Sequence, residues 1–174
     1  MKTLVLLRHA KSDWSEPDKN DFDRPLNERG VKDAPVMGKA VRNIDVPPQI
    51  IYSSDALRAK MTAEAVSTSS GAGIPIEYKN EFYNADAAEM LGFIKTIPAN
   101  YESVLLIGHN PTFEELTTMM ISSGQARLRF PTSALAVLKS EIDDWKDAAP
   151  GMFTLELFLN PKVVKSIAKG NNKE

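Results

Sequence analysis

The chain has only two histidines, and each follows an apolar run of the kind that forms a buried strand. Residues 1–7 lead directly into Arg8 and His9, and residues 104–107 lead, after one glycine, into His109. In open α/β sheets, ligands bind just beyond the carboxyl ends of the strands. Two imidazoles at that edge, with an arginine beside one of them, are groups that phosphoryl transfer requires.

A third segment follows the same plan of strand, polar turn and helix. It runs through residues 50–58 and places Arg58 in the first turn of its helix. If the three strands are parallel neighbours, two imidazoles, two guanidiniums and two helix N-termini converge at one edge. Guanidinium groups bind phosphate oxygens in pairs, and helix N-termini present free N–H groups to anions. The set contains no obvious acid, which favours a pocket for a dianionic group.

These residues predict a two-step reaction. A neutral His9 ring can attack phosphorus with one nitrogen while its other nitrogen donates to a backbone carbonyl. Water then cleaves the phosphohistidine in a second step. Arg8, Arg58 and a protonated His109 would offset the charge on the phosphoryl oxygens without Mg²⁺. We therefore expect neither a metal nor another cofactor.

The elements that must position these groups alternate between strand-like and helical patterns. Strands are expected at 2–7, 49–52, 74–78, 103–107, 134–138 and 153–159. Helices are expected at 27–43, 56–67, 86–97 and 111–122. Pro35 lies inside the first of them, so that helix either kinks there or begins nearer residue 33. The alternation predicts one α/β domain with a mainly parallel sheet, an antiparallel edge strand and helices on both faces. We expect the domain to span residues 1–161 and the Lys- and Asn-rich tail 162–174 to fray.

Two local features add to this plan. Residues 10–26 show no sustained periodicity and are expected to form a long ordered loop, and loops of that length in compact domains are usually functional. Two helix starts carry the spacing of a capping box, Asp86 with Glu89 and Thr112 with Glu115.

Composition limits the kinds of partner. The 174 residues are 43% hydrophobic, enough for one sizeable core, and the net charge of −2 gives no basic field for nucleic acid or anionic membranes. The chain has no cysteine, which excludes disulfides, thiolate metal sites and a cysteine nucleophile. The apolar run at the N-terminus is too short for a signal peptide, and no run approaches the roughly 20 residues of a membrane span. We expect a cytoplasmic protein.

Four segments, in this order, resemble the motifs of the histidine phosphatase superfamily. Leu-Arg-His-Ala at 7–10 resembles its first histidine signature, and Pro-Leu-Asn-Glu-Arg-Gly at 25–30 resembles its Pro-Leu-Thr-Glu-Arg-Gly turn. Residues 53–64 are similar to its Ser-x-x-x-Arg-Ala-x-x-Thr-Ala segment, and Gly-His-Asn-Pro at 108–111 matches its second histidine motif. The resemblance implies a phosphoglycerate mutase-like fold.

Within that superfamily, the short chain without a lid insertion resembles the SixA branch, the phosphohistidine phosphatases. The resemblance implies that His9 is the nucleophile and that Arg8, Arg58 and His109 hold the phosphoryl group. It also implies that the substrate is phosphohistidine in a protein, such as a phosphorelay histidine domain, and that inorganic phosphate is a product.

Three further residues have alternative roles. Ser12 could bind phosphate or make a hydrogen bond within its loop, and Asn110 could face the pocket or cap the next helix. Glu81 lies roughly where larger family members place a general acid, although a solvated carboxylate is the simpler interpretation. A missing acid favours phosphohistidine as substrate, because its P–N bond breaks readily once the nitrogen is protonated.

Three other functions remain open at this stage. The same chemistry could act on small phosphate monoesters, or the chain could be a non-catalytic module that binds phosphate or phosphopeptides. A site with two histidines could also hold a metal, but the sequence lacks metal-ligand spacing such as His-x-x-x-His.

Overall fold

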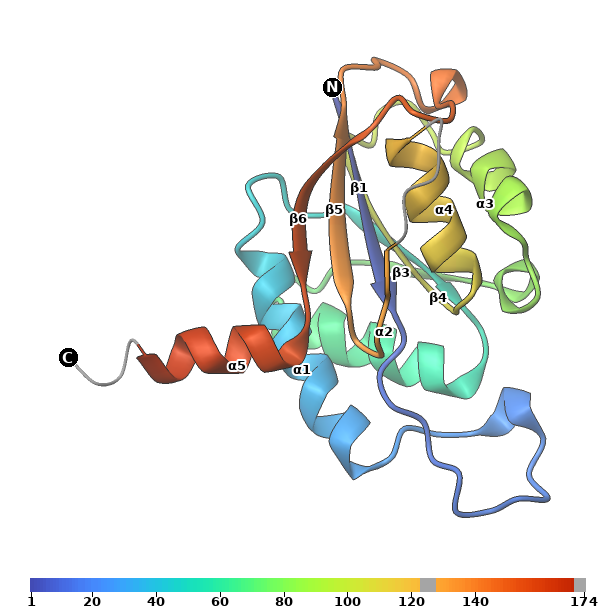
Figure 1. Cartoon of the computed structure of the whole chain (residues 1–174), viewed down its shortest axis with the longest axis vertical. Helices are drawn as coiled ribbons and strands as arrows, with labels where there is room; N and C mark the ends of the chain where they lie inside the picture. Colours follow the sequence, from blue (N-terminus) through green and yellow to red (C-terminus); the bar gives the residue numbers. More distant parts are fainter. Residues whose placement is uncertain (123–127, 171–174) are drawn as a thin grey trace.

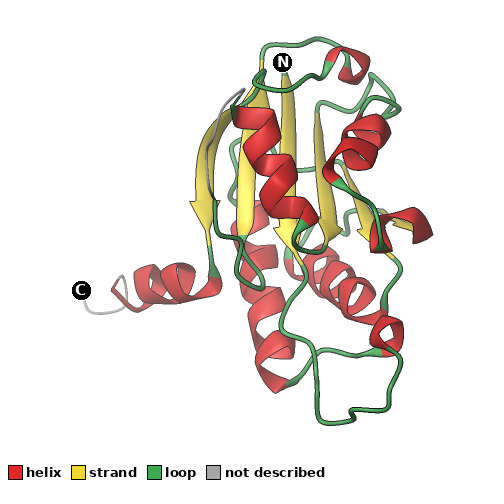
Figure 2. Cartoon of the chain, turned by 45° about the vertical axis from the view of Figure 1, so that its right-hand side comes forward, coloured by secondary structure: helices red, strands yellow, loops and turns green. Residues whose placement is uncertain are grey.

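The computed structural model describes residues 1–122 and 128–170, which form a six-stranded sheet between two layers of helices (Figures 1 and 2). The strands are β1 (Lys2–Arg8), β2 (Ile50–Ser54), β3 (Ile76–Lys79), β4 (Ser103–Gly108), β5 (Leu135–Ser140) and β6 (Thr154–Leu159). The α-helices are α1 (Glu28–Arg42), α2 (Leu57–Ser69), α3 (Ala87–Ile94), α4 (Thr112–Ile121) and α5 (Pro161–Gly170). Three short 3-10 helices span Asp21–Asp23, Asn80–Tyr83 and Trp145–Asp147.

The strand order β3-β2-β4-β1-β5-β6 confirms the predicted fold class. The pairs β1–β4, β2–β4 and β2–β3 are parallel. β5 is antiparallel to β1, and β6 is the antiparallel edge strand beside β5. The register pairs Arg8 with Gly108 and Ser53 with Ile107. The chain therefore leaves β1, β4 and β2 at the same edge of the sheet, as the sequence pattern predicted.

Side chains of the central strands alternate between the two faces of the sheet, which follows from the two-residue period of a strand. In β1, Leu4 and Leu6 pack on the face covered by α3 and α4. Val5 and Leu7 pack on the face covered by α1 and α2. Because both faces are covered, the central residues 4–7 of β1 are all apolar and buried, and they hold the carboxyl end of the strand in a fixed position.

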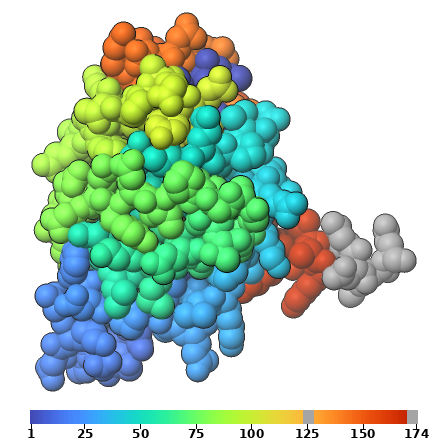
Figure 3. Space-filling model, turned by 180° about the vertical axis from the view of Figure 1, so that it is seen from behind, coloured from blue at the N-terminus to red at the C-terminus, as the bar shows by residue number. Residues whose placement is uncertain are grey.

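The beginning of the loop at residues 10–26 makes backbone contacts with the end of the loop, just before α1. An isolated bridge pairs Ser12 with Leu26, and Asp13 N–H donates to the carbonyl of Pro25 at 2.8 Å. The expectation of an ordered loop is therefore confirmed. In the space-filling view this loop, in blue, forms the lower end of the molecule (Figure 3).

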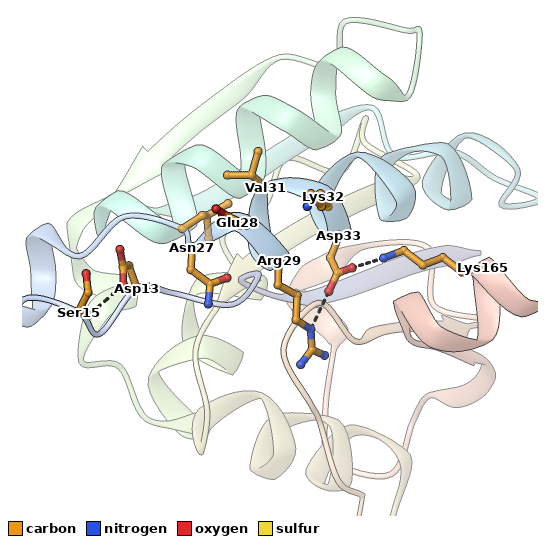
Figure 4. Close-up of a pocket in the computed structure, with 10 residues that line it drawn as sticks. Asp13, Ser15, Asn27, Glu28, Arg29, Val31, Lys32, Asp33 and Lys165 are labelled. Carbon is orange, nitrogen blue, oxygen red and sulfur yellow. Dashed lines mark hydrogen bonds and ion pairs between the residues drawn. The ribbon is translucent and has the colours of Figure 1, made fainter.

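The C-terminal segment differs from its sequence prediction. Residues expected to fray form α5, whose Lys165 ammonium lies 2.5 Å from Oδ1 of Asp33 in α1 (Figure 4). Arg29 donates to the other oxygen of Asp33 at 3.2 Å. The Asp33 carboxylate is buried, and a buried charge is stable only when it is paired, so these two cations anchor it. Residues 171–174 of the predicted tail lie outside the described residues.

The two predicted capping boxes have different outcomes. Asp86 and Glu89 form a complete capping box at the start of α3. The prediction for Thr112 and Glu115 is wrong, because the Thr112 hydroxyl donates instead to the carbonyl of Ala85 at 2.7 Å. None of the helices in residues 1–122 and 128–170 combines the length and the apolar character needed to cross a bilayer.

Candidate active site

A cavity of about 270 Å³ opens at the carboxyl ends of β1, β2 and β4. Ten residues line it: Arg8, His9, Lys11, Ser12, Trp14, Asp21, Arg58, His109, Asn110 and Thr132. The structure thus brings together six of the seven residues singled out in the sequence. Glu81 is the exception.

His9 is buried, and its two ring nitrogens have different partners. Nδ1 lies 2.7 Å from the carbonyl oxygen of Ala10, so Nδ1 carries the proton and donates. Nε2 accepts from Nε–H of Arg58 at 3.3 Å and therefore carries a lone pair. Burial holds the pKa of His9 well below 6.5, and the neighbouring His109 and Arg58 lower it further. The ring is neutral at pH 7, in the tautomer that nucleophilic attack requires.

Thr62 fixes the backbone beside this ring. Its hydroxyl donates to the carbonyl of Arg58 at 2.6 Å and accepts from the N–H of Ala10 at 3.0 Å. One side chain thus connects the residue after His9 to the first turn of α2. This explains physically why a threonine stands four residues after Arg58 in the motif.

His109 lies against His9, with the two ring centroids 5.0 Å apart and the rings tilted by 55°. Nδ1 lies 3.4 Å from Nη2 of Arg58, which can only donate, so Nδ1 accepts. Nε2 then carries the proton and donates to the hydroxyl of Ser54 at 2.9 Å.

The charge state of His109 depends on what lies beside the ring. Burial and the nearby Arg58 lower the pKa of His109 to about 4, so the ring is neutral at pH 7 with these neighbours. The sequence prediction of a protonated His109 concerns the ring beside a phosphoryl group, and it stays a prediction. A phosphate dianion beside the ring would raise its pKa again, because a nearby negative charge favours the protonated form.

The two arginines of the cavity have different hydrogen-bond partners. Arg58 is buried and donates from Nη1 to the carbonyl of Asp21 at 2.6 Å and from Nη2 to its carboxylate at 3.0 Å. Arg8 donates from Nη1 to the carbonyl of Phe130 at 2.8 Å, while its buried Nε has no hydrogen-bond partner among the described residues. Burial lowers the pKa of Arg8, and a phosphoryl oxygen would supply the missing acceptor.

Asp21 is a charged site residue that sequence reasoning missed. Its carboxylate accepts from Arg58 and from the hydroxyl of Tyr83 at 2.8 Å. Burial raises the pKa of Asp21, but the hydrogen bond from Tyr83 and the charge of Arg58 outweigh burial and hold that pKa below its usual value. Asp21 is therefore ionised at neutral pH and cannot serve there as a proton donor.

Comparison with known proteins assigns this arrangement to a family. The model of the histidine phosphatase superfamily (branch 1) matches residues 4–133. The chain belongs to the histidine phosphatase superfamily.

Solved structures place this histidine phosphatase near SixA. Two bacterial structures carry the provisional name phosphohistidine phosphatase SixA. The one from Nakamurella multipartitia is 28% identical, with a TM-score of 0.80 over 92% of this chain and 96% of that one. The one from Agrobacterium tumefaciens is 36% identical, with a TM-score of 0.76 over 92% of this chain and 98% of that one.

A sequence relative also spans most of the chain. An uncharacterised chloroplastic protein of Arabidopsis thaliana is 30% identical over an alignment that covers 92% of this chain and 78% of that protein. Together with the SixA-like structures, these comparisons identify the protein as a phosphatase that acts on a phosphorylated substrate and releases phosphate.

Glu81 has no place in the site of this histidine phosphatase. It is exposed in the 3-10 helix Asn80–Tyr83 and does not line the cavity. The geometry gives no support to Glu81 as a general acid. The carboxylate that does reach the cavity belongs to Asp21, and Tyr83 is the residue of that 3-10 helix that contacts it.

Ser12 and Asn110 both line the cavity of the phosphatase and both make internal hydrogen bonds. Ser12 Oγ accepts from the indole N–H of Trp14 at 3.1 Å, which is the loop interaction considered as one alternative. Asn110 donates through its amide to Glu114 at 2.8 Å and to the carbonyl of Phe130 at 2.9 Å. Its side chain does not cap α4.

The donor set of the phosphatase does not resemble a metal centre. Within residues 1–122 and 128–170 there is no group of three or more His, Cys, Asp or Glu side chains placed to hold a metal ion. The cationic groups that line the cavity suit an anion instead.

Proposed function

We propose that this phosphatase hydrolyses phosphohistidine in proteins through a phosphorylated His9. The observation that carries the proposal is the neutral His9 ring, which lines a cavity together with Arg8 and Arg58 and whose unprotonated Nε2 accepts from Arg58. A module that only binds phosphate needs the cations but does not need an imidazole fixed in this tautomer.

In the first step, the Nε2 lone pair of His9 forms a bond to phosphorus. The bond between phosphorus and the substrate nitrogen breaks, and its electron pair stays on that nitrogen, which takes a proton from solvent. The products are phosphorylated His9 and an unmodified histidine on the substrate protein. Arg8 and Arg58 offset the negative charge on the transferred oxygens, and that is where most catalysis of phosphoryl transfer lies.

In the second step, the oxygen of a water molecule forms a bond to phosphorus. The bond between phosphorus and Nε2 breaks, and the electron pair returns to His9. One proton of the water is released, so the products are inorganic phosphate and the neutral ring. The hydrogen bond from Nδ1 to the carbonyl of Ala10 keeps the ring in the same orientation through both steps.

The choice of phosphohistidine over an alcohol ester rests on the missing acid. An alkoxide is a poor leaving group and needs a positioned proton donor, whereas an imidazole nitrogen takes its proton readily. The carboxylate at the cavity, Asp21, is held ionised by Tyr83 and Arg58. Similarity to the SixA-named structures supports the same choice. A phosphorelay histidine domain is the kind of protein partner we propose.

The test compares substrates side by side with the full chain. A phosphohistidine-containing protein domain should be turned over faster than a panel of sugar and nucleotide monophosphates, and radiolabelled substrate quenched without acid should label His9. The His9→Ala variant should remain folded and lose at least about 10³-fold in rate. Faster turnover of small esters would mean that these esters, and not phosphohistidine, are the substrates. Vanadate binding without turnover of any substrate would indicate a binding module.

A further inference from the structure

Trp14 is the most exposed of the large apolar side chains in the described structure, at 62% relative exposure. It lies five residues after His9 and lines the same cavity. Of the ten residues that line this cavity, it alone offers an indole or phenyl surface. The reaction steps above give it no role.

Two contacts hold the indole in place. Its N–H donates to Ser12 Oγ at 3.1 Å, and the guanidinium carbon of Arg24 lies 3.8 Å from the centre of its ring. Arg24 is itself fixed beside Asp21, with Nε at 3.5 Å from the carboxylate. One face of the ring is therefore covered and its orientation is set, although most of the side chain stays open to solvent.

The path of the loop turns Trp14 to the side of the cavity. Lys11, Ser12 and Trp14 line the cavity, whereas Asp13 and Ser15 line a separate groove beside α1 (Figure 4). The loop thus divides its side chains between two surfaces. Trp14 belongs to the one that holds His9.

We propose that Trp14 forms the subsite for the leaving group and stacks on its imidazole ring. This inference rests on the proposed function, because it concerns the part of phosphohistidine that lies beyond the phosphoryl group. The cationic residues of the cavity account for the phosphoryl oxygens and leave the indole as the surface for a flat ring. Stacking on an aromatic side chain recognises any planar ring regardless of the surrounding sequence.

Two small substrates with the same kind of scissile bond test the subsite. N-phosphoimidazole and phosphoramidate both have a P–N bond, but only the first has a ring on the leaving group. Trp14→Ala should lower kcat/KM for N-phosphoimidazole about tenfold while changing that for phosphoramidate less than twofold, since aromatic stacking contributes roughly this much. Trp14→Phe should restore most of the loss, because it keeps an aromatic face.

A matched control uses another exposed apolar residue. Met152 is 47% exposed and lies in the loop before β6, and Met152→Ala should change neither rate constant. A second readout is intrinsic fluorescence. Trp145 is fully buried, so a change in emission when imidazole is added in the presence of vanadate should come from Trp14 and should be absent in Trp14→Phe.

The kinetics of Trp14→Ala on the two substrates can contradict the subsite in two ways. Equal losses on both substrates with Trp14→Ala would show that the indole only supports the loop, and unchanged rates would show that it does not touch the substrate. Either result overturns the subsite and leaves the proposed function intact. A wild-type protein that hydrolyses phosphate esters but neither P–N compound would overturn the proposed function and the subsite together.

Discussion

The Nε–H of Arg58 donates to Nε2 of His9 across 3.3 Å. Because a guanidinium cannot accept a hydrogen bond, this contact requires a lone pair on the nitrogen that would attack phosphorus. The same guanidinium is held from its other side by Asp21, through the backbone carbonyl and the carboxylate. Arg58 thus contacts both the His9 ring and the loop at residues 10–26, so the position of that loop helps to hold Arg58 against the ring.

Arg58→Ala should weaken both anion binding and turnover. Hydrogen bonds to charged groups contribute about 1.5 to 3 kcal/mol each, so vanadate affinity should fall on the order of 10- to 100-fold. Titration with vanadate and measurement of kcat/KM check this together. Arg42→Ala removes an exposed arginine at the end of α1 and should leave both quantities unchanged. An unaltered vanadate affinity in the Arg58 variant would place the phosphoryl group elsewhere.

Asp21→Asn tests whether this carboxylate acts as a general acid. Asparagine keeps a side-chain oxygen that can accept from Arg58 and Tyr83, so the network should persist. Turnover of a phosphohistidine peptide should change less than about tenfold. A general acid typically contributes 10²- to 10⁴-fold, so a loss of that size would make Asp21 the proton donor. The site would then no longer favour phosphohistidine over phosphate esters on the ground that it lacks an acid.

The sheet could be predicted from the sequence because it depends on local patterns. The same holds for the four residues that were expected to bind and attack the phosphoryl group, Arg8, His9, Arg58 and His109. Apolar runs such as residues 2–7 indicate strands, and strand ends of a parallel sheet meet at one edge, so Arg8, His9 and His109 could be placed without coordinates. Arg58 could be placed because its helix follows such a strand directly.

Asp21 and Trp14 could not be predicted in the same way. They lie in a loop without periodicity, and Asp21 reaches Arg58 across 37 positions in the chain. The helix α5 was missed for a related reason, since its Lys165 contacts Asp33 across 132 positions and an isolated Lys-rich segment gives no sign of this. The neutral state of His109 follows from burial, which only the packed structure defines.

The acid limb of the pH profile should lie below the ordinary range of histidine. Burial lowers the pKa of His9 well below 6.5 and that of His109 to about 4. Since the neutral His9 ring is the nucleophile, activity is full above the lowered pKa of His9 and falls only as the pH drops through that pKa. An exposed imidazole would place this fall near pH 6.5, and burial moves it to lower pH.

Measurement of kcat/KM reports the ionisation of the free enzyme and is the quantity to follow. Between pH 8 and pH 6 it should stay within about twofold for phosphoramidate, after correction for spontaneous hydrolysis and for ionisation of the substrate itself. A fall centred on pH 6.5 would mean that His9 titrates as an exposed ring and that its neighbours do not hold it neutral.

Gly30, in the first turn of α1, packs against the loop that follows His9. A Cβ at this position would lie 2.3 Å from the carbonyl oxygen of Lys11 and 3.0 Å from its nitrogen, closer than packed atoms can approach. Lys11 cannot easily retreat, because its carbonyl also accepts from the N–H of Asn27 at 3.0 Å. Gly30→Ala should therefore lower the free energy of unfolding by about 1 to 3 kcal/mol.

The same change should reduce activity in the molecules that remain folded, because Lys11 lies two residues after His9 and lines the cavity. Gly92 in α3 is the matched control, since a Cβ there would meet no atom within 4 Å. Gly92→Ala should raise the free energy of unfolding by roughly 0.5 to 1 kcal/mol, because alanine favours the helix, and should leave kcat/KM unchanged. Denaturant titration and kinetics on both variants separate the effects. If Gly30→Ala behaved like Gly92→Ala, the contact between α1 and the loop would not be what positions the residues after the nucleophile.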